Sequence, residues 1–476
     1  MKNNFLNRVY FTIFISILLS ISISSCKDDN PPAGPDEPDN PIPDSVITIN
    51  HFIHDNMDFA YYWNDKMPDL DPTKETDSKE YFEKLLYKAI DRWSFITDDY
   101  QGLLDYFSGI RKSVGYSYRL YRVSDSNNDV VGFIEYVNPN TPADEAGLKR
   151  GDMFFEINDT KLTTENYMDL IGLDSFTLTL GELNDDYTIT PIGAQINLTA
   201  EVLTIDPILL DTVIEHAGEK IGYLVYNSFV SDYDNELKQV FTDFKDEGVS
   251  GLVVDLRYNS GGSVNTAVLM ASMISPVADT GKVLLNNSFN QNLTDYFKEK
   301  YPDDESIFVD RILSTPNNLN LPRYVALTTY KTASASEMVI YTLMPYMDVI
   351  QIGEQTHGKY YGSITMSDPD KKHNWAIQPI VMRAENANNS IDYSQGLLPR
   401  EDLQLRERYK YQLGDKREKF LAQALYELTG VWPEKTSASL KSQQIPVFDH
   451  NYIEEGTDLN LKYNMHKDIK EVIRVE

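Results

Sequence analysis

Short apolar segments alternate with amphipathic helical segments between Lys220 and about Thr429. The runs of strand length are residues 221–226, 251–256, 324–329 and 348–352, and the helical segments are residues 232–247, 266–274 and 336–344. Strands that alternate with helices predict parallel pairing with helical crossovers. We therefore expect an α/β domain with a mostly parallel sheet over residues 206–430.

The segments before this domain have other patterns. Apolar residues recur at helical spacing within residues 46–112, at Phe82, Leu85, Leu86, Ala89, Ile90 and Trp93. This spacing predicts a small helical domain with a helix that continues to Trp93 and a core that includes Tyr61, Tyr62 and Trp63. Residues 113–205 instead contain short strand-like runs, at 132–137, 152–157 and 176–180. Residues 431–476 are assigned only as a packed C-terminal extension.

Three short stretches contain the residue types that a serine nucleophile requires. They are residues 253–262 (VVDLRYNSGG), 332–337 (TASASE) and 353–359 (GEQTHGK). The first ends in glycines whose amides can approach a ligand closely, the second places a serine before an apolar helix, and the third ends in a lysine. Nucleophilic catalysis by serine needs a base and an amide pocket for the developing oxyanion.

Together these stretches resemble the S41 serine peptidases, the carboxyl-terminal processing or tail-specific proteases. The resemblance covers roughly residues 80–430 and implies a serine endopeptidase with a Ser334/Lys359 dyad. By the same resemblance, Gly261 or Gly262 would form the oxyanion hole together with Ala335. Asp255 and Arg257 are expected to form a buried structural pair.

Each proposed catalytic residue also has a structural interpretation. Ser334 and Glu337 match a capping box at the start of a helix, in which case Ser334 only caps; if Ser334 is the nucleophile, Ser336 is expected to take over or share the cap. A lysine is usually a solvated cation, and Lys359 becomes a useful base only if burial lowers its pKa.

The resemblance is incomplete after the lysine. The family usually places a lysine-orienting glutamine four residues further on, where this chain has Ser363. Ser363 is a possible replacement through its hydroxyl. His357 lies two residues before Lys359, and a mechanism that uses a histidine is a second hypothesis.

Residues 142–152 (PADEAGLKRGD) resemble a PDZ signature. In PDZ domains a peptide adds as a strand and its terminal carboxylate is held by loop amides. The candidate loop contains Gly115 and Tyr116, followed by Ser117 in place of the usual apolar residue. The domain is therefore expected to capture substrate C-termini or, alternatively, only to brace the protease domain.

The N-terminus has the features of a targeting segment. Residues 1–25 combine Lys2 and Arg8 with a fifteen-residue apolar stretch, and Cys26 follows two serines. The pattern resembles the lipobox of bacterial lipoproteins, and the acidic residues after Cys26 resemble an export signal of Bacteroidetes-type surface lipoproteins. We expect lipidation of Cys26, an extended proline-rich acidic linker over residues 26–45, and an outer-membrane location, exposed at the cell surface if that signal acts.

Composition limits the remaining functions. The net charge of −30 argues against nucleic-acid partners, because phosphate binding needs an excess of lysine and arginine. The chain has no Walker or Rossmann glycine pattern and no metal-ligand spacing, so no cofactor or metal is implied. The expected partners are protein or peptide substrates and the membrane. Two other hypotheses are a catalytically inactive, peptide-binding surface lipoprotein and a glycan-binding or adhesion lipoprotein.

Overall fold

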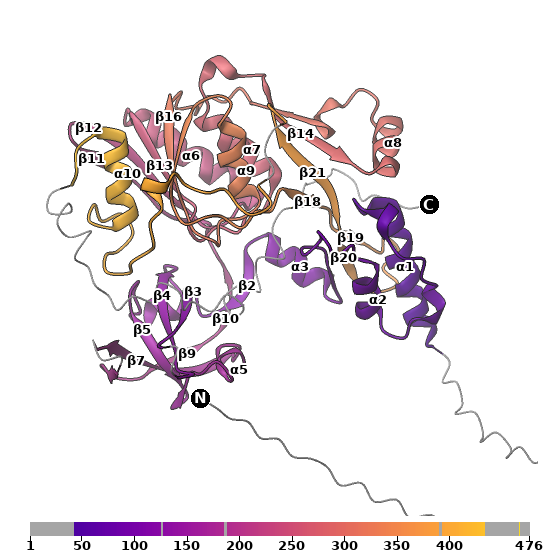
Figure 1. Ribbon diagram of the computed structural model, residues 1–476, viewed down its shortest axis with the longest axis horizontal. Coiled ribbons are helices and arrows are strands. Elements are labelled where there is room, and N and C mark those ends of the chain that lie inside the picture. Colours follow the sequence, from indigo (N-terminus) through magenta and orange to yellow (C-terminus); the bar gives the residue numbers. More distant parts are fainter. Residues whose placement is uncertain (1–41, 125–126, 185–187, 390–392, 434–465, 467–476) are drawn as a thin grey trace, which may run out of the picture. The chain divides into compact units, whose positions relative to one another are not determined.

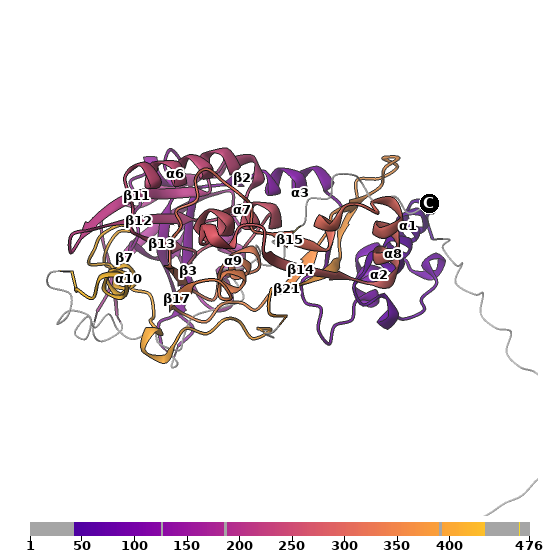
Figure 2. The ribbon, with the colours of Figure 1, turned by 90° about the horizontal axis from the view of Figure 1, so that it is seen from above.

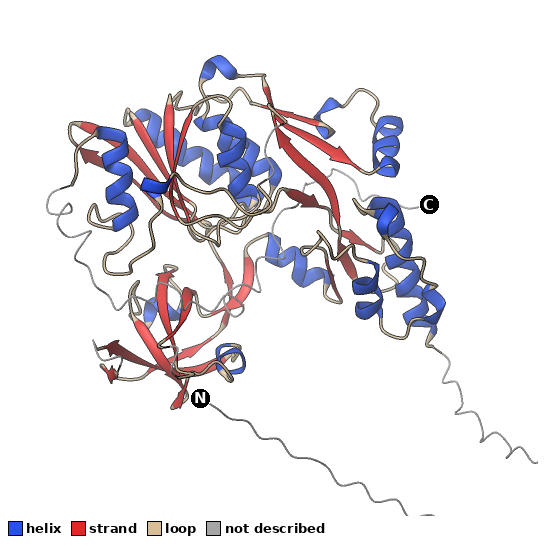
Figure 3. Ribbon diagram, viewed as in Figure 1, coloured by secondary structure: helices blue, strands red, loops and turns tan. Residues whose placement is uncertain are grey.

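The computed structural model describes residues 42–124, 127–184, 188–389, 393–433 and 466. Figures 1 and 3 show the helices and strands of these residues. The predicted signal peptide, Cys26 and most of both the linker and the C-terminal extension lie outside them. None of the helices in the described ranges is both long and apolar enough to span a bilayer.

A five-stranded sheet with the order β11-β12-β13-β16-β17 forms the centre of the α/β region. The strands are β11 (Ile208–His216), β12 (Glu219–Tyr226), β13 (Gly251–Asp255), β16 (Arg323–Thr328) and β17 (Asp348–Gly353). β11 pairs antiparallel with β12, and the other three pairings are parallel. The predicted parallel α/β sheet is therefore confirmed.

Helices cover both faces of this sheet (Figure 2). They are α6 (Asp234–Asp246), α7 (Val264–Ile274), α9 (Ala335–Leu343) and α10 (Lys419–Thr429). Successive residues of β13 pack into different hydrophobic cores. Leu252 and Val254 pack with α6, α7 and α9, whereas Val253 packs with α10. This alternation explains why β13 is apolar throughout, as strands buried on both faces are.

An antiparallel sheet with the order β15-β14-β21-β18 extends from the α/β region. Its strands are β14 (Val283–Phe289), β15 (Val309–Arg311), β18 (Tyr361–Ser363) and β21 (Ile380–Asn386), with α8 (Gln291–Lys300) inserted between β14 and β15. A three-stranded sheet, β1-β20-β19, is built from β1 (Phe95–Thr97), β19 (Met366–Ser367) and β20 (Ala376–Gln378). β1 therefore joins the N-terminal region to the residues that follow Lys359.

The N-terminal region contains the helices α1 (Asp44–Ala60), α2 (Ser78–Leu85) and α3 (Tyr100–Phe107). Tyr61 and Trp63 are buried as predicted, and they share one continuous core with the α/β region. The prediction that the second helix continues to Trp93 is wrong, because α2 ends at Leu85. The Asp91 carboxylate accepts the N–H groups of Trp93 and Ser94, which stabilises a turn instead.

The PDZ-like domain is a twisted antiparallel sheet with the order β3-β4-β5-β7-β8. Its elements are β3 (Tyr116–Arg122), β4 (Val130–Val137), α4 (Pro142–Glu145), β5 (Met153–Ile157), β6 (Thr160–Lys161), α5 (Tyr167–Ile171), β7 (Ser175–Leu183), β8 (Ile189–Pro191) and β9 (Ile196–Thr199). The pair β2 (Ile110–Ser113) and β10 (Glu201–Thr204) connects it to the rest of the chain. Gly147 has φ +80° just after α4, as the predicted helix end requires.

Candidate active site

Ser334 lies on a sharp turn between β16 and α9. Its backbone has φ 63° and ψ −118°, a conformation that costs a non-glycine residue about 1–3 kcal/mol and that concentrates at functional sites. The side chain is fully buried, and Ser334 and Glu337 have the predicted capping-box arrangement at the start of α9. Within the described residues, however, the Ser334 Oγ makes no hydrogen bond of good geometry. Ser336 does not act as the cap, contrary to expectation: its hydroxyl donates to the Asn259 carbonyl at 3.0 Å.

The two glycines of the first stretch lie against this turn. A Cβ atom on Gly261 would lie 2.7 Å from the Ser334 Cβ and 3.1 Å from the Ala335 nitrogen, so only glycine fits there. The Gly261 N–H donates to the Asn259 side chain at 2.8 Å. Among the described residues, the N–H groups of Gly262 and Ala335 have no acceptor. Of the two glycine amides, only that of Gly262 is available to a ligand.

Asn259 fixes the positions of both backbone segments. Its side chain donates to the Tyr226 carbonyl at 2.8 Å, and its own carbonyl accepts from the Ala333 N–H at 3.2 Å. The residue therefore ties the glycine loop to the turn that carries Ser334. The sequence pattern had assigned Asn259 no role.

Lys359 is buried in the loop that follows β17, and burial lowers its pKa to about 7. Asp91 and Glu337 oppose the shift through their negative charges. A lysine with this pKa is substantially neutral at pH 7 and above, which the capacity to accept a proton requires.

Glu337 joins the serine turn to the lysine loop. Its Oε2 accepts the Ser334 N–H at 2.8 Å and the Lys359 N–H at 2.8 Å, while its Oε1 accepts the Thr356 hydroxyl at 2.5 Å and the Gly358 N–H at 2.6 Å. Burial raises its pKa to about 7, against the effect of these four donors. The sequence predicted only the capping bond to Ser334.

The N-terminal region contacts the lysine loop through the turn at Asp91. The Trp93 indole N–H donates to Nε2 of His357 at 3.4 Å, so this nitrogen is the acceptor of a neutral imidazole. Burial and the nearby cations Arg92 and Lys359 lower the pKa of His357 to about 4. His357 therefore contacts Trp93 rather than acting as a charged or freely titrating group.

Ser363 belongs to a chain of polar contacts that includes Gln378 and Thr365. Its Oγ accepts a hydrogen bond from Gln378 Nε2 at 2.9 Å, and Thr365 Oγ1 donates to Gln378 Oε1 at 2.6 Å. Both Ser363 and Gln378 are buried. Gln378 lies on β20, and nothing in the sequence next to Lys359 indicates that Gln378 would contact Ser363.

The candidate peptide loop of the PDZ-like domain is already hydrogen-bonded. The Gly115 N–H donates to Ser113 Oγ at 3.0 Å, and Tyr116 starts β3 opposite Val137. The Ser117 hydroxyl donates to the Glu135 carboxylate at 2.7 Å, which also accepts from Lys331 at 2.7 Å. Because Lys331 lies three residues before Ser334, a buried ion pair connects this domain to the serine turn.

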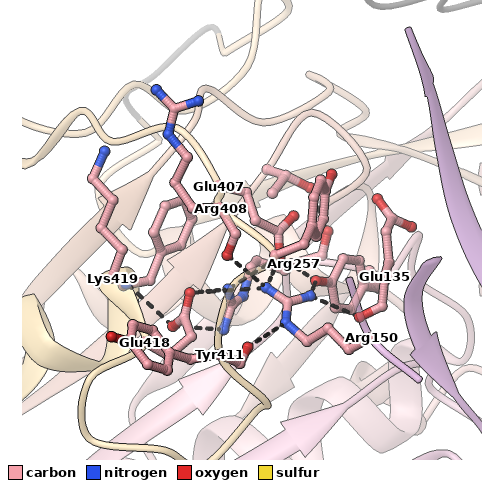
Figure 4. A network of polar contacts seen from close by, with 12 residues as sticks. Glu135, Arg150, Arg257, Glu407, Arg408, Tyr411, Glu418 and Lys419 are labelled. Atoms are coloured by element: carbon pink, nitrogen blue, oxygen red, sulfur yellow. Dashed lines mark hydrogen bonds and ion pairs between the residues drawn. The ribbon is translucent and has the colours of Figure 1, made fainter. Parts of the chain in front are cut away.

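A second buried ionic network lies between the PDZ-like signature and the strand that precedes the glycine loop (Figure 4). Arg257 binds Asp255 at 2.5 Å, as expected, and also Glu407 and Glu418. Arg150, from the signature at residues 142–152, binds Glu407 at 2.8 Å. Burial alone would raise the pKa of Glu407, but the two arginines outweigh it and hold the pKa at about 2.

This fold and site define a multidomain α/β protein with the domain order of a PDZ-containing serine peptidase. Family models match in the same order: the peptidase S41 N-terminal domain at residues 48–95, a PDZ domain at 133–173 and peptidase family S41 at 220–384. The chain belongs to peptidase family S41.

Similarity to individual proteins supports this placement. A chloroplastic C-terminal processing peptidase from Tetradesmus obliquus is 28% identical over 237 residues, which cover 46% of each chain. The carboxy-terminal processing protease CtpA of Bacillus subtilis is 25% identical and is matched over 48% of this chain and 45% of its own. The chain thus spans about half the length of the curated relatives it matches. The crystal structure of a candidate S41 protease from Bacteroides fragilis NCTC 9343 superimposes with a TM-score of 0.67 at 27% identity, covering 80% of this chain and 98% of that one.

Proposed function

We propose that the chain is a serine endopeptidase in which Ser334 is the nucleophile and Lys359 the general base. The observation that carries this proposal is the Glu337 carboxylate, which holds the Ser334 and Lys359 backbones through one oxygen while burial lowers the lysine pKa to about 7. A structural cap requires neither a buried lysine nor a strained serine whose hydroxyl has no hydrogen-bond partner in the described residues.

The proposed reaction is an acyl transfer in two steps. Neutral Lys359 takes the Ser334 hydroxyl proton as Oγ attacks the scissile carbonyl carbon. The resulting ammonium donates this proton to the leaving amine, and the C–N bond breaks to give an acyl-enzyme. A water molecule then loses a proton to Lys359 and attacks the ester carbonyl. The acyl C–Oγ bond breaks, the Lys359 ammonium returns the proton to Ser334 Oγ, and the new carboxyl terminus is released.

The Gly262 and Ala335 amides are the proposed oxyanion hole. Both N–H groups lack an acceptor within the described part of the chain, and Gly261 is excluded because Asn259 already accepts its N–H. The Ala335 N–H also lies at the N-terminus of α9, where the helix favours negative charge. Removing one such donor typically costs about 10²–10³ in rate.

The PDZ-like domain is proposed to capture the C-termini of substrates. The support is its sheet and the loop at Gly115 and Tyr116. The Gly115 N–H, which now donates to Ser113 Oγ, would donate to the terminal carboxylate of a bound peptide instead. Amidation of a bound peptide's C-terminus should weaken binding by about tenfold, the loss of one charged hydrogen bond. Equal affinity for the free and amidated peptides would leave the domain with a bracing role.

Lipidation of Cys26 and an outer-membrane location are also proposed, on the sequence pattern of residues 1–29 alone. Cys26→Ser should leave the precursor unlipidated and release it from the membrane fraction. A mutant protein that still sediments with the outer membrane would contradict the lipobox interpretation.

The decisive experiment incubates the chain from residue 27 onward with an unfolded protein and identifies the fragments by mass spectrometry. The unmodified chain should produce new C-termini, and Ser334→Ala should produce none. Ser336→Ala is the matched control, because it removes a nearby serine hydroxyl that bonds only a carbonyl. If neither the unmodified chain nor the control cleaves between pH 6 and 9, the inactive peptide-binding function replaces this proposal.

A further inference from the structure

His466 belongs to the C-terminal part of the chain but lies buried beside the candidate active site. Its backbone N–H donates to the Gly262 carbonyl at 3.3 Å, and its carbonyl accepts from the Val264 N–H at 3.1 Å. These bonds form a parallel bridge opposite Ser263. The loop that contains the proposed oxyanion donor thus pairs with a distant piece of the same chain.

The other side of His466 faces the segment that follows Lys359. A second parallel bridge joins it to Ser363, the last residue of β18, four positions after Lys359. Its imidazole packs on the Phe107 ring at the end of α3, with centroids 4.3 Å apart and the planes inclined by 31°. His466 therefore sits as a strand residue between the glycine loop and β18.

An extended residue held by backbone bonds to a neighbouring backbone is the arrangement expected of strand addition. The Gly262 carbonyl and the Val264 N–H form an acceptor and donor pair that any extended peptide can use, because the contact involves only its backbone. The contact lies one residue from Gly261, which packs against Ser334. A strand at this position therefore lies along the loop that packs against Ser334.

We propose that the segment at His466 occupies, in cis, the strand position that a peptide substrate takes at this site, so that the chain competes with its own substrates. The proposal rests on the proposed function for the meaning of the site, although the binding contact does not depend on catalysis. A tethered segment competes at its effective local concentration, so even weak contacts matter. The ligand class is an extended polypeptide with an aromatic or imidazole side chain placed on Phe107.

The first test compares the chain from residue 27 onward with a form that ends at residue 433. Removal of the segment should lower KM on the order of tenfold and leave kcat within about twofold, as loss of a competitor requires. In the intact chain, His466→Pro should lower KM about fivefold, because proline cannot donate to the Gly262 carbonyl. His466→Ala keeps both backbone bonds and loses only the ring contact with Phe107, so it should lower KM less than His466→Pro does.

The opposite result would identify a structural strand instead. If the shortened chain loses activity while its melting temperature is unchanged, the segment completes the site rather than competing for it, and the proposal is wrong. A fall in melting temperature together with activity would also overturn it, because the segment would then be part of the folded core.

The second test uses binding and works even if the protein cleaves nothing. A fluorescent peptide of residues 460–472 should bind the shortened Ser334→Ala chain saturably, and at least tenfold more weakly to the intact Ser334→Ala chain, whose site is filled. Phe107→Ala should weaken binding to the shortened form. Equal binding to both forms, or none to the shortened one, overturns the inference. If the peptide binds as expected but the unmodified chain cleaves no substrate, only the catalytic proposal is wrong.

Discussion

At the scale of single residues, burial decides whether the candidate site can transfer a proton. Lys359 is surrounded by protein, so its charged form loses hydration, and its pKa falls to about 7. His357, two residues earlier, is neutral at the same pH because its pKa falls to about 4 and Trp93 donates to it. The lysine, and not the histidine, titrates in the range where a base is needed.

The activity should accordingly follow the neutral fraction of Lys359. A depressed pKa means that the base is protonated and inactive below about 7 and becomes active as pH rises through that value. Lys359→Ala and Lys359→Arg should both abolish cleavage, because arginine keeps its proton throughout this range. His357→Ala should retain most activity. An active Lys359→Ala together with an inactive His357→Ala would replace the dyad with a histidine mechanism.

Glu337 provides a second test at this scale. Glu337→Gln keeps the shape but turns an NH₂ group toward two of the four donors. This mismatch should cost about 1–3 kcal/mol of unfolding free energy. Since both proposed catalytic segments would shift, kcat should fall on the order of 10²-fold while KM changes little. Glu236→Gln, on the exposed side of α6, serves as the control for both the urea unfolding and the kinetics. A Glu337→Gln chain with wild-type kcat would show that the clamp is unnecessary.

At the scale of elements, the early end of α2 matters most for the site. The apolar spacing predicts a helix to Trp93, but the chain turns after Leu85 and Ile90 is exposed. The reason is tertiary: the Tyr61 hydroxyl donates to Asp91 at 2.8 Å and accepts the Tyr87 N–H at 3.0 Å, which fixes the turn against the core. This turn brings the Asp91 charge near Lys359 and Trp93 onto His357.

Asp91→Asn should therefore shift the pH dependence without removing the base. The Asp91 charge raises the Lys359 pKa, so its loss should move the midpoint of the rate profile to lower pH. The asparagine oxygen can still accept the Trp93 and Ser94 N–H groups, which should preserve the turn. Asp98→Asn, an exposed carboxylate in the same segment, should leave the midpoint in place. A midpoint that rises in Asp91→Asn contradicts the electrostatic argument.

At the scale of the whole molecule, buried ion pairs connect the PDZ-like domain to the α/β region. Lys331 pairs with Glu135 next to the serine turn, and Arg150 pairs with Glu407 beneath the glycine loop. Removing one member of a buried pair leaves a charge without its partner, and this is far more costly than breaking an exposed pair. The connection between the domains should therefore depend on charge pairing as well as on apolar contact.

Lys331→Met measures this dependence. It should lower the unfolding free energy by about 3–5 kcal/mol in urea titration, because Glu135 stays buried without its ammonium partner. Lys161→Met breaks an exposed pair with Asp129 in the same domain and should cost at most about 1 kcal/mol. The double variant Lys331→Met/Glu135→Gln should recover part of the loss. If Lys331→Met and Lys161→Met lower the unfolding free energy equally, the Lys331–Glu135 pair behaves as an exposed pair and the argument from burial is wrong.

The sequence by itself determined the features that depend on short-range pattern. Strand and helix alternation, the glycine turn after α4 and the stretches around Ser334 and Lys359 are local, because hydrophobic periodicity and turn chemistry act over a few residues. Tertiary structure alone decided which groups these stretches contact. The four donors on Glu337, the Asp91 charge near Lys359, the Gln378 bond to Ser363 and the strand contact of His466 join residues far apart in the chain. Such polar contacts are selected by packing geometry, because a buried donor or acceptor must find its partner wherever the folded chain places one.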